Sequence, residues 1–300
     1  MKNLRYLLPL VICLTLLISC NEKSSFVSFT YPEGKTKALV LSYDDGAIED
    51  IQLAKLFDDN KLIGTFNLNS KYFSTTRGWP QQNGDTIYQR YIPKDSLLII
   101  YKNHEIAAHG AYHKNFFDIS DEEILEELNT DIELLEKFTN RKVISMAYPF
   151  GNANDSIAKL VGSTGLLNGR TIADTFAFGF PENDMLWHPT CHDSKALNYL
   201  DAYLNLNQQE LSVFYVWGHS WELKDETRWN NMVTFCKKIG QSRDIWSVSH
   251  GELTTYKLAL DQIQMEGNQI SNPSESLSVW LKLTNGIKEL KPGASILLNP

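Results

Sequence analysis

The chain has 300 residues, of which 43% are hydrophobic and 21% are charged, a composition typical of a globular protein. Its formal net charge is −8, and no run of Lys or Arg interrupts this acidic balance. Because nucleic-acid binding requires a basic surface that neutralises phosphates, the charge argues against a nucleic-acid partner. The length suits one large α/β domain with a small addition.

The first residues are typical of an export signal. "MKNLRYLLPLVICLTLLISC" places basic residues ahead of an apolar stretch that is short for a membrane span. The ending "LISC" resembles a bacterial lipoprotein signal, which predicts a signal peptide over 1–19, a lipid anchor on Cys20 and a tether over 20–35. We therefore expect an exported protein anchored to a bacterial membrane on its periplasmic or cell-surface side. An uncleaved anchor helix is the alternative.

Strand-like and helix-like segments alternate along residues 36–260. Strands are expected at 38–43, 63–69, 104–108, 143–147, 167–172, 211–217 and 245–249. Helices are expected at 47–59, 120–140, 155–164, 194–205, 225–240 and 251–260. In the clearest helix, Ser120 and Glu123 form a capping-box pattern ahead of an apolar repeat at helical spacing. The alternation predicts a parallel sheet with right-handed crossovers, either closed as a barrel or open and doubly wound.

Two segments fall outside this alternation. Residues 70–100 contain a polar stretch too long for a simple connection, which we expect to overhang a site. Residues 261–300 change to short alternating strands, and Asn285-Gly286 is typical of a hairpin turn, so we predict a small antiparallel β appendage. Beyond the signal, the cysteines are Cys191 and Cys236, and both one disulfide and two thiols are compatible with the sequence.

Acidic and imidazole side chains follow the ends of three predicted strands. "LVLSYDDG" ends in Asp44 and Asp45; a turn or a helix cap would explain the pair, but not the apolar strand in front. His109 and His113 follow the third strand at a common metal-ligand spacing, and His219 follows the sixth. In a parallel barrel the strand ends meet at one face, so we expect these side chains to converge. Two His and one carboxylate would leave positions on a zinc-like ion for water and substrate.

Four short motifs, taken in order, resemble the polysaccharide deacetylases, the family with the nodulation-deacetylase homology domain (carbohydrate esterase family four). "SYDDG" at 42–46 resembles TFDDG, and "HGAYH" at 109–113 resembles H-[S/T]-x-x-H. "YPFG" at 148–151 resembles most of R-x-P-[Y/F]-G, and "VWGH" at 216–219 approximates L-x-x-H. The resemblance covers roughly 36–258. It implies an α/β fold, a distorted (β/α)7 barrel of the glycoside hydrolase/deacetylase type, here with a small C-terminal β appendage.

The resemblance also implies a role for each residue that follows a strand. Asp44 would be the general base, and His219 would be the general acid for the leaving amine or alcohol. Asp45, His109 and His113 would hold a divalent metal, with Zn²⁺ as the expected ion.

The remaining motifs imply a substrate pocket. The backbone N–H of Phe150 would help to hold the oxyanion, and Tyr148 and Pro149 belong to the same motif. Val216 and Trp217 would help to wall the acetyl pocket.

The chain departs from the family pattern at two positions. Gly110 stands where the family has Ser or Thr, and Ala147 stands where the family has the Arg that orients the base. We predict that Arg170, in the next strand, brings a guanidinium to Asp44, because its planar fork suits a carboxylate. A surface salt bridge is the alternative for this Arg. The family motif that carries an Asp and a Trp is not cleanly visible, and Asp174 and the segment "MLWHPTCHD" are candidates.

Other polar and aromatic residues carry weaker signals. His104 and His250 are interpreted as structural residues. Three further residues are interpreted as ordinary loop residues, with substrate-binding groups as the alternative: His188, His192 and Asp193. Three tryptophans either stack on sugar rings or pack in the core or at the rim: Trp79, Trp187 and Trp221.

The sequence therefore predicts an exported, lipid-anchored and metal-dependent hydrolase acting on carbon–nitrogen bonds other than peptide bonds. It would remove acetyl groups from an N-acetylated or O-acetylated sugar in a polysaccharide or oligosaccharide. The expected partners are an acetylated glycan and, through Cys20, a membrane. Two alternatives stay open: a catalytically weakened carbohydrate-binding barrel, motivated by the missing Arg, and an O-acetyl carbohydrate esterase.

Overall fold

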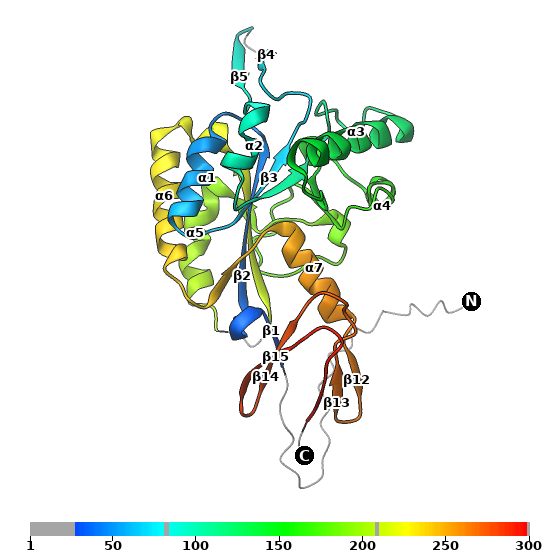
Figure 1. Ribbon diagram of the computed structural model, residues 1–300. Helices are drawn as coiled ribbons and strands as arrows, with labels where there is room; N and C mark the ends of the chain where they lie inside the picture. Colours follow the sequence, from blue (N-terminus) through cyan, green and yellow to red (C-terminus); the bar gives the residue numbers. More distant parts are fainter. Residues whose placement is uncertain (1–27, 81–83, 208–209, 299–300) are drawn as a thin grey trace, which may run out of the picture.

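The computed structural model describes residues 28–80, 84–207 and 210–298 (Figure 1). The predicted signal peptide at 1–19, the predicted lipid anchor on Cys20 and the first part of the predicted tether lie outside these residues. Within the described part of the chain, no helix is both long and apolar enough to cross a membrane.

A curled parallel sheet forms the centre of the molecule. Its strands lie in the order β8–β7–β6–β3–β2–β10–β9, and β11 pairs with the first residues of β2. The strands are β2 (Lys37–Asp45), β3 (Gly64–Leu68), β6 (Glu105–Ala108), β7 (Ser145–Ala147), β8 (Asn168–Arg170), β9 (Cys191–His192), β10 (Ser212–His219) and β11 (Ile245–Ser247). The parallel α/β architecture is confirmed, and β9 is the strand that the sequence pattern missed.

The segment before β9 joins the two ends of this sheet. Trp187 forms a parallel bridge with Arg170 beside β8, and the Thr190 N–H donates to the Tyr215 carbonyl in β10. The sheet is therefore curled into the distorted barrel that the sequence predicted.

Helices pack around the outside of the sheet (Figure 1). They are α1 (Asp50–Asp59), α2 (Leu97–Ile100), α3 (Asp121–Thr139), α4 (Asp155–Gly162), α5 (Asp193–Leu204), α6 (Glu226–Gly240) and α7 (His250–Asp261). Short 3-10 turns are η1 (Pro32–Gly34), η2 (Lys94–Ser96), η3 (Pro149–Gly151), η4 (Asp184–Leu186) and η5 (Ser220–Lys224). The predicted capping box starts α3: Ser120 and Glu123 each donate a backbone N–H to the other's side chain.

Alternation along β2 decides which side chains enter the barrel. Leu39, Leu41 and Tyr43 pack in the core cluster that includes residues of the outer helices, whereas Ala38 and Val40 belong to a second, separate cluster with Trp187 and Tyr215. Since successive strand residues point to opposite faces, the even-numbered positions of β2 face the interior. Asp44, two residues after Ser42, continues this inner face at the end of the strand.

The predicted long connection at 70–100 contains an antiparallel hairpin, β4 (Thr76–Pro80) and β5 (Thr86–Arg90). This hairpin and the C-terminal sheets lie at opposite ends of the molecule (Figure 1). The C-terminal strands are β12 (Gln264–Glu266), β13 (Gln269–Ser271), β14 (Val279–Leu283), β15 (Gly286–Leu290) and β16 (Ser295–Leu297). In the β14–β15 hairpin Leu283 pairs with Gly286, so the turn residues are Thr284 and Asn285, one position earlier than predicted.

Part of the predicted tether belongs to the folded molecule. β1 (Ser28–Thr30) pairs antiparallel with β14, and Tyr31 is fully buried against Trp246 and Tyr256. The tether interpretation is therefore wrong for residues 28–35. Strand pairing fixes β1 to β14 of the C-terminal sheet, and aromatic packing fixes Tyr31 to β11 and α7.

The two cysteines in the described chain are free thiols. Cys191 and Cys236 are both buried, and burial raises the pKa of the Cys191 thiol to about 12. Of the two alternatives left open by the sequence, the structure has the thiols.

Candidate active site

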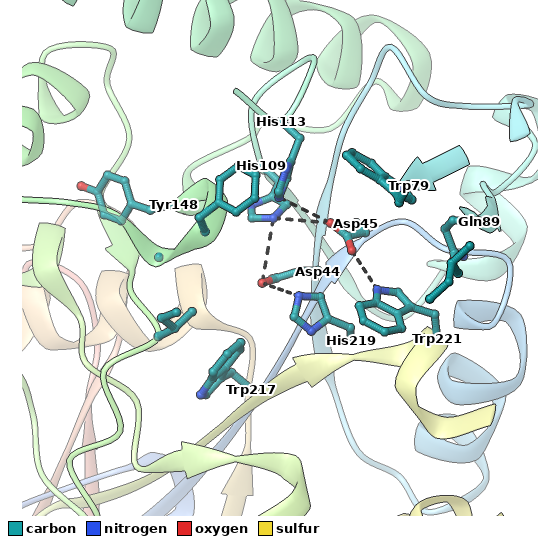
Figure 2. Close-up of a pocket in the computed structure, with 14 residues that line it drawn as sticks. Asp44, Asp45, Trp79, Gln89, His109, His113, Tyr148, Trp217, His219 and Trp221 are labelled. Carbon is teal, nitrogen blue, oxygen red and sulfur yellow. Dashed lines mark hydrogen bonds and ion pairs between the residues drawn. The ribbon is translucent and has the colours of Figure 1, made fainter. Parts of the chain in front are cut away.

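The residues predicted to converge lie together at the carboxyl ends of β2, β6 and β10. Asp44, Asp45, His109, His113 and His219 line one cavity of about 530 Å³ (Figure 2). Strand register explains part of this meeting, because His219 is the direct Cα partner of Asp44 in the β10–β2 pair. The prediction that these side chains share one face of the barrel is confirmed.

The two adjacent carboxylates reach the same cavity because the chain turns between them. Asp45 has φ of 80° and Gly46 has φ of 71°, so the backbone leaves the extended conformation immediately after Asp44. Asp44 therefore points inward as a strand residue, while Asp45 turns back toward the histidines. A positive φ at a non-glycine residue is strained and concentrates at functional sites.

Asp45, His109 and His113 form a candidate metal site. The Nε2 atoms of both histidines lie 3.7 Å from Oδ1 of Asp45. Nδ1 of His109 donates to the Ala147 carbonyl at 2.8 Å, so Nε2 carries the lone pair. Burial and His109 lower the pKa of His113 to about 4, which keeps its imidazole neutral. Ligand atoms so spaced fit one ion at bond lengths of about 2.0–2.2 Å, so these residues fit a divalent metal.

Buried carboxylates of α3 hold the loop that carries both histidines. Gly110 has φ of 74°, and a Cβ there would lie 3.3 Å from the Glu127 side chain, which favours glycine. Glu127 accepts the backbone N–H of Tyr112, and Asp131 accepts the N–H of His109 at 2.9 Å. These carboxylates stabilise the loop in a chain that lacks the hydroxyl of the family pattern.

Asp44 is almost fully buried and is held by donors from two strands. Nη2 of Arg170 donates to both carboxylate oxygens, and Nδ2 of Asn67 donates to Oδ1 at 2.8 Å. Arg170 is the Cα partner of Ala147 in the β7–β8 pair, so the guanidinium comes from the strand beside the expected one. The predicted contact is therefore confirmed. Burial alone would raise the pKa of Asp44, but the charge of Arg170, with a smaller contribution from His219, outweighs burial and lowers the pKa to about 2.

His219 lies at the end of β10, with Nε2 4.0 Å from Oδ2 of Asp44. Its Nδ1 lies 3.4 Å from Oε2 of Glu222 in η5. The same Glu222 oxygen accepts a hydrogen bond from Arg228 and contacts His192. Burial alone would lower the pKa of His219, but Glu222 and the site carboxylates raise it to about 9. The imidazole is therefore protonated at neutral pH.

A second group of side chains has ligand-like spacing but carries its own cation. His192, His219 and Glu222 offer atoms within 4.8 Å of one another. Nη2 of Arg228 lies 3.1 Å from Glu222 and 2.6 Å from Asp193, so this group forms an ion-pair network. We therefore assign its carboxylate to His219 rather than to a metal.

Aromatic and aliphatic side chains form the walls of the cavity. Figure 2 shows Trp79, Gln89 and Trp221 on one side of the ligand cluster, and Tyr148 and Trp217 on the other. Further lining residues come from β5, η3 and the segment after β8: Ile87, Phe150, Gly151 and Ile172. Apart from the Gln89 amide, the walls are therefore mainly aromatic and aliphatic, while the carboxylates and histidines gather at the strand ends.

Two residues predicted to bind substrate do not line the cavity. Val216 is fully buried in the main core cluster, because the strand alternation that turns Trp217 inward turns Val216 outward. Pro149 is buried in the turn that positions Phe150, whose φ is 59°. Tyr148, Phe150 and Trp217 do line it, and Arg170 lies behind Asp44.

The weaker sequence signals separate into structural and site residues. Trp187, His104 and His250 are buried away from the cavity, as the structural interpretation expects. Asp174 accepts a hydrogen bond from Nε1 of Trp217 at 2.9 Å and thereby fixes one wall.

Sequence reasoning missed two residues that contact the predicted machinery. Glu222 contacts His219, and its spacing of three residues within "HSWE" was an available signal. Asn67 contacts Asp44, and its place in "GTFNLN" gives alternating polar residues on the inner face of a buried strand.

The fold and the ligand cluster together define the class of protein. It is a distorted parallel barrel that carries a candidate metal site of two His and one Asp at its strand ends. Residues 31–169 match the family described as "Polysaccharide deacetylase". The comparison with curated protein sequences finds no significant match.

Several solved structures are similar to this chain at low sequence identity. A candidate polysaccharide deacetylase from Mycobacterium smegmatis is 16% identical with a TM-score of 0.56, covering 77% of this chain and 93% of that chain. A family 4 carbohydrate esterase from Streptomyces lividans is 13% identical with a TM-score of 0.44, covering 71% and 92%. A family 4 pseudoenzyme from Bacillus anthracis is 17% identical with a TM-score of 0.45, covering 74% and 66%. The Mycobacterium structure supports the barrel fold.

Proposed function

We propose that the protein is a metal-dependent deacetylase that hydrolyses the acetyl group of an acetylated glycan. The observation that carries the proposal is the arrangement around Asp44. A buried carboxylate paired with Arg170 lies next to the candidate metal ligands on one side and next to the protonated His219 on the other. This arrangement offers a proton acceptor, a proton donor and a cation site within one cavity.

Each group has a distinct part in the proposed reaction. A divalent ion held by Asp45, His109 and His113 would polarise the acetyl carbonyl and activate water. Asp44 would accept a proton from the attacking water, since Arg170 keeps its carboxylate ionised. His219 would donate a proton to the leaving nitrogen or oxygen. The Phe150 N–H would donate a hydrogen bond to the developing oxyanion.

The missing Arg of the third motif no longer favours a weakened, binding-only barrel. Arg170 makes the contact with Asp44 that position 147 lacks. The other alternative, an O-acetyl esterase, would use the same groups, because His219 can protonate an alkoxide as well as an amine. N-acetylated and O-acetylated glycans are therefore both included in the test.

The test is acetate release by the zinc-loaded protein from a set of N-acetylated and O-acetylated glycans. Asp44→Asn should retain bound metal and lose activity by about 100- to 10,000-fold. His113→Ala should lose metal and activity together. Tyr88→Ala, an exposed change that does not touch the cavity, is the control. Wild-type protein that binds metal but releases no acetate from any member of the set would overturn the proposal in favour of a binding barrel.

We further propose export and lipid attachment at Cys20, which rests on the leading sequence. The described chain starts with β1, at the end of the molecule away from the β4–β5 hairpin (Figure 1). An attachment on the N-terminal side of β1 would leave the cavity facing outward. Cys20→Ala should move the protein from the membrane fraction to the soluble fraction, and an unchanged distribution would contradict the anchor.

A further inference from the structure

Polar side chains fill the inside of the barrel directly beneath Asp44. Ser42 is fully buried on the inner face of β2, two residues before Asp44. Its hydroxyl accepts hydrogen bonds from Nε of Arg170 at 3.2 Å and from Nδ2 of Asn67 at 2.9 Å. The same two side chains donate to the Asp44 carboxylate. One buried hydroxyl therefore holds both of the donors that hold Asp44.

The direction of the Ser42 hydroxyl follows from the chemistry of these partners. The N–H groups of a guanidinium and of an amide can only donate, and a hydroxyl oxygen has two lone pairs to receive them. Both lone pairs of Ser42 are used, so its proton must point to another acceptor.

The Tyr215 phenol is the acceptor for this proton. In the β10–β2 pair Tyr215 is the Cα partner of Val40, so it lies diagonally across from Ser42 on the same inner face. Burial raises the pKa of the Tyr215 phenol, and the charge of Arg170 and a hydrogen bond with Ser42 oppose that rise. A hydrogen bond that lowers the pKa of a phenol is one that its oxygen accepts, so Ser42 donates to Tyr215.

His250 receives the next proton. The Tyr215 hydroxyl lies 2.9 Å from Nδ1 of His250, and it cannot donate back to Ser42, whose lone pairs are filled. Burial and the charge of Arg170 hold the pKa of His250 well below its usual range, so its imidazole is neutral. Nδ1 then carries the lone pair and Nε2 the proton. The hydrogen bonds thus run in one direction, from Arg170 and Asn67 through Ser42 and Tyr215 to His250; we call these five side chains the interior chain.

The start of α7 fixes the far end of the interior chain. The backbone N–H of His250 donates to Oγ1 of Thr65 at 2.9 Å, and Thr65 donates to Oε2 of Glu105 at 2.8 Å. The N–H of Gly251 donates to the same Glu105 oxygen at 3.0 Å. Nε2 of His250 has no hydrogen-bond partner among the described residues, and the imidazole meets the Trp187 ring edge to face at 4.9 Å, a geometry that suits N–H···π contacts. Strands β3 and β6 therefore hold His250 in place.

We propose that Tyr215 and His250 are positioning residues for the reaction at Asp44. Neither lines the cavity, and both act through Ser42 on the donors that orient the Asp44 carboxylate. Without the Tyr215 hydroxyl the Ser42 proton loses its acceptor, so the Ser42 hydroxyl turns and displaces the donors above it. The proposal rests on the proposed function and adds the groups that keep its proton acceptor aligned with the attacking water.

Nitrogen-15 NMR at neutral pH tests the interior chain without turnover. In the wild type, Nδ1 of His250 should resonate as an unprotonated nitrogen and Nε2 as a protonated one. Tyr215→Phe should shift the signals of His250 Nδ1 and of the Arg170 Nε–H. Tyr203→Phe removes another buried hydroxyl, which donates to the Ala38 carbonyl at 2.7 Å, and should shift neither signal. A proton on Nδ1 of His250, or an Arg170 signal that stays in place in Tyr215→Phe, would overturn the interior chain.

Substitutions of His250 test whether its effect reaches Arg170. His250→Asn keeps an acceptor, because its amide oxygen takes the position of Nδ1, and should leave the Arg170 signal near its wild-type position. His250→Leu removes the acceptor and should shift the Arg170 signal as Tyr215→Phe does. Equal shifts in the Asn and Leu variants would mean that packing, and not the hydrogen bond, connects His250 to Arg170.

Kinetics of the zinc-loaded protein on an acetylated glycan test the positioning role. Tyr215→Phe should lower kcat by about 10- to 100-fold and leave KM and zinc affinity unchanged, because a small displacement of the base affects the transition state more than binding. His250→Leu should lower kcat likewise, and His250→Asn should recover most of the rate. Tyr203→Phe should keep the wild-type kcat.

The double variant Tyr215→Phe/His250→Leu should be no slower than the slower single variant, because both changes break the same chain. Losses of kcat that multiply would contradict a shared chain. An unchanged kcat in Tyr215→Phe would overturn the positioning role and leave the deacetylase assignment standing. If the wild type releases acetate from no N-acetylated or O-acetylated glycan, the deacetylase assignment fails and the positioning role fails with it, whereas the NMR signals still decide whether the interior chain exists.

Discussion

Arg170 lies directly behind Asp44 and donates from Nη2 to both oxygens of its carboxylate. The side chains are 0% and 3% exposed, so the pair is shielded from water. Nε of Arg170 also donates to Ser42, and the guanidinium carbon lies 5.1 Å from the centroid of the Trp217 ring. The arginine is thus fixed by several contacts and can hold Asp44 in one orientation.

Arg170→Met should destabilise the fold, because it leaves Asp44 as a buried charge without its main partner. Breaking such a pair costs about 3–5 kcal/mol of unfolding free energy. Urea unfolding at neutral pH measures the loss.

The double variant Asp44→Asn/Arg170→Met separates the pair from the general packing of Arg170. It should recover much of the stability lost in Arg170→Met, because no uncompensated carboxylate remains. Additive losses in the double-mutant cycle would mean that the two side chains are not energetically coupled.

The site was predictable where it follows from local pattern. The apolar run of β2 and the alternation of strands and helices place Asp44, His109 and His219 at one end of a parallel barrel before any coordinates are known. Arg170 could be named because the family pattern has an arginine one strand away. Arg170 is the Cα partner of Ala147, so its guanidinium enters from the neighbouring strand at the level where the family pattern has its arginine.

Other features depend on tertiary structure that a sequence does not display. Val216 and Trp217 are neighbours in an apolar run. Because both faces of β10 are buried, the sequence does not show which of the two side chains points into the cavity, and the structure shows that Trp217 does. β9 is short and pairs with β10. The sheet is closed only because the segment before β9 also bridges to Arg170 at the end of β8. Glu222 belongs to a 3-10 turn, so its three-residue spacing from His219 indicates a contact only once that turn is known.

Trp221→Phe should weaken metal binding without removing a ligand. The indole N–H holds Oδ2 of Asp45, which leaves Oδ1 directed at both histidines. Loss of a hydrogen bond that orients a ligand costs about 10- to 100-fold in metal affinity. Competition with a zinc chelator measures the affinity directly.

Trp79→Phe is the matched control, because it removes an indole from the same cavity without touching Asp45. Its zinc affinity should equal that of the wild type. Equal affinity in both variants would show that the Trp221 N–H does not orient the metal ligand.

Glu222→Gln should shift the alkaline limb of the pH–rate profile. In the proposed reaction His219 must be protonated, so the rate falls as pH rises through its pKa of about 9. Removing the negative charge at Glu222 lowers this pKa, and the limb should move to lower pH by about 1 to 3 units. The profile of kcat/KM between neutral and alkaline pH measures the shift.

Glu226→Gln, an exposed change at the start of α6, serves as the control for the charge change alone. An alkaline limb that stays at the wild-type pH in Glu222→Gln would assign the limb to another group.

Asp50→Asn should change how stability depends on pH. Asp50 is fully buried at the start of α1, Tyr101 donates to its Oδ2 at 2.6 Å, and burial raises its pKa to about 7. In the unfolded chain the same carboxyl has a pKa of about 3.9. Between these two pH values the carboxyl is ionised in the unfolded chain but protonated in the folded protein. The contribution of Asp50 to the free energy of unfolding therefore falls as pH rises. The unfolding free energy falls by up to about 1.4 kcal/mol per pH unit in this range.

Urea unfolding at a series of pH values gives the unfolding free energy of wild type and variant. The difference between them isolates the contribution of Asp50, since the other titrating groups are common to both. Relative to wild type, Asp50→Asn should gain stability steadily from about pH 4 to pH 7 and then remain level. Asp59→Asn, which changes an exposed carboxylate in the same helix, should give no such difference. A constant offset between wild type and Asp50→Asn across the whole range would mean that Asp50 is ionised in the folded protein. The buried carboxyl would then need a cation or water that offsets its charge.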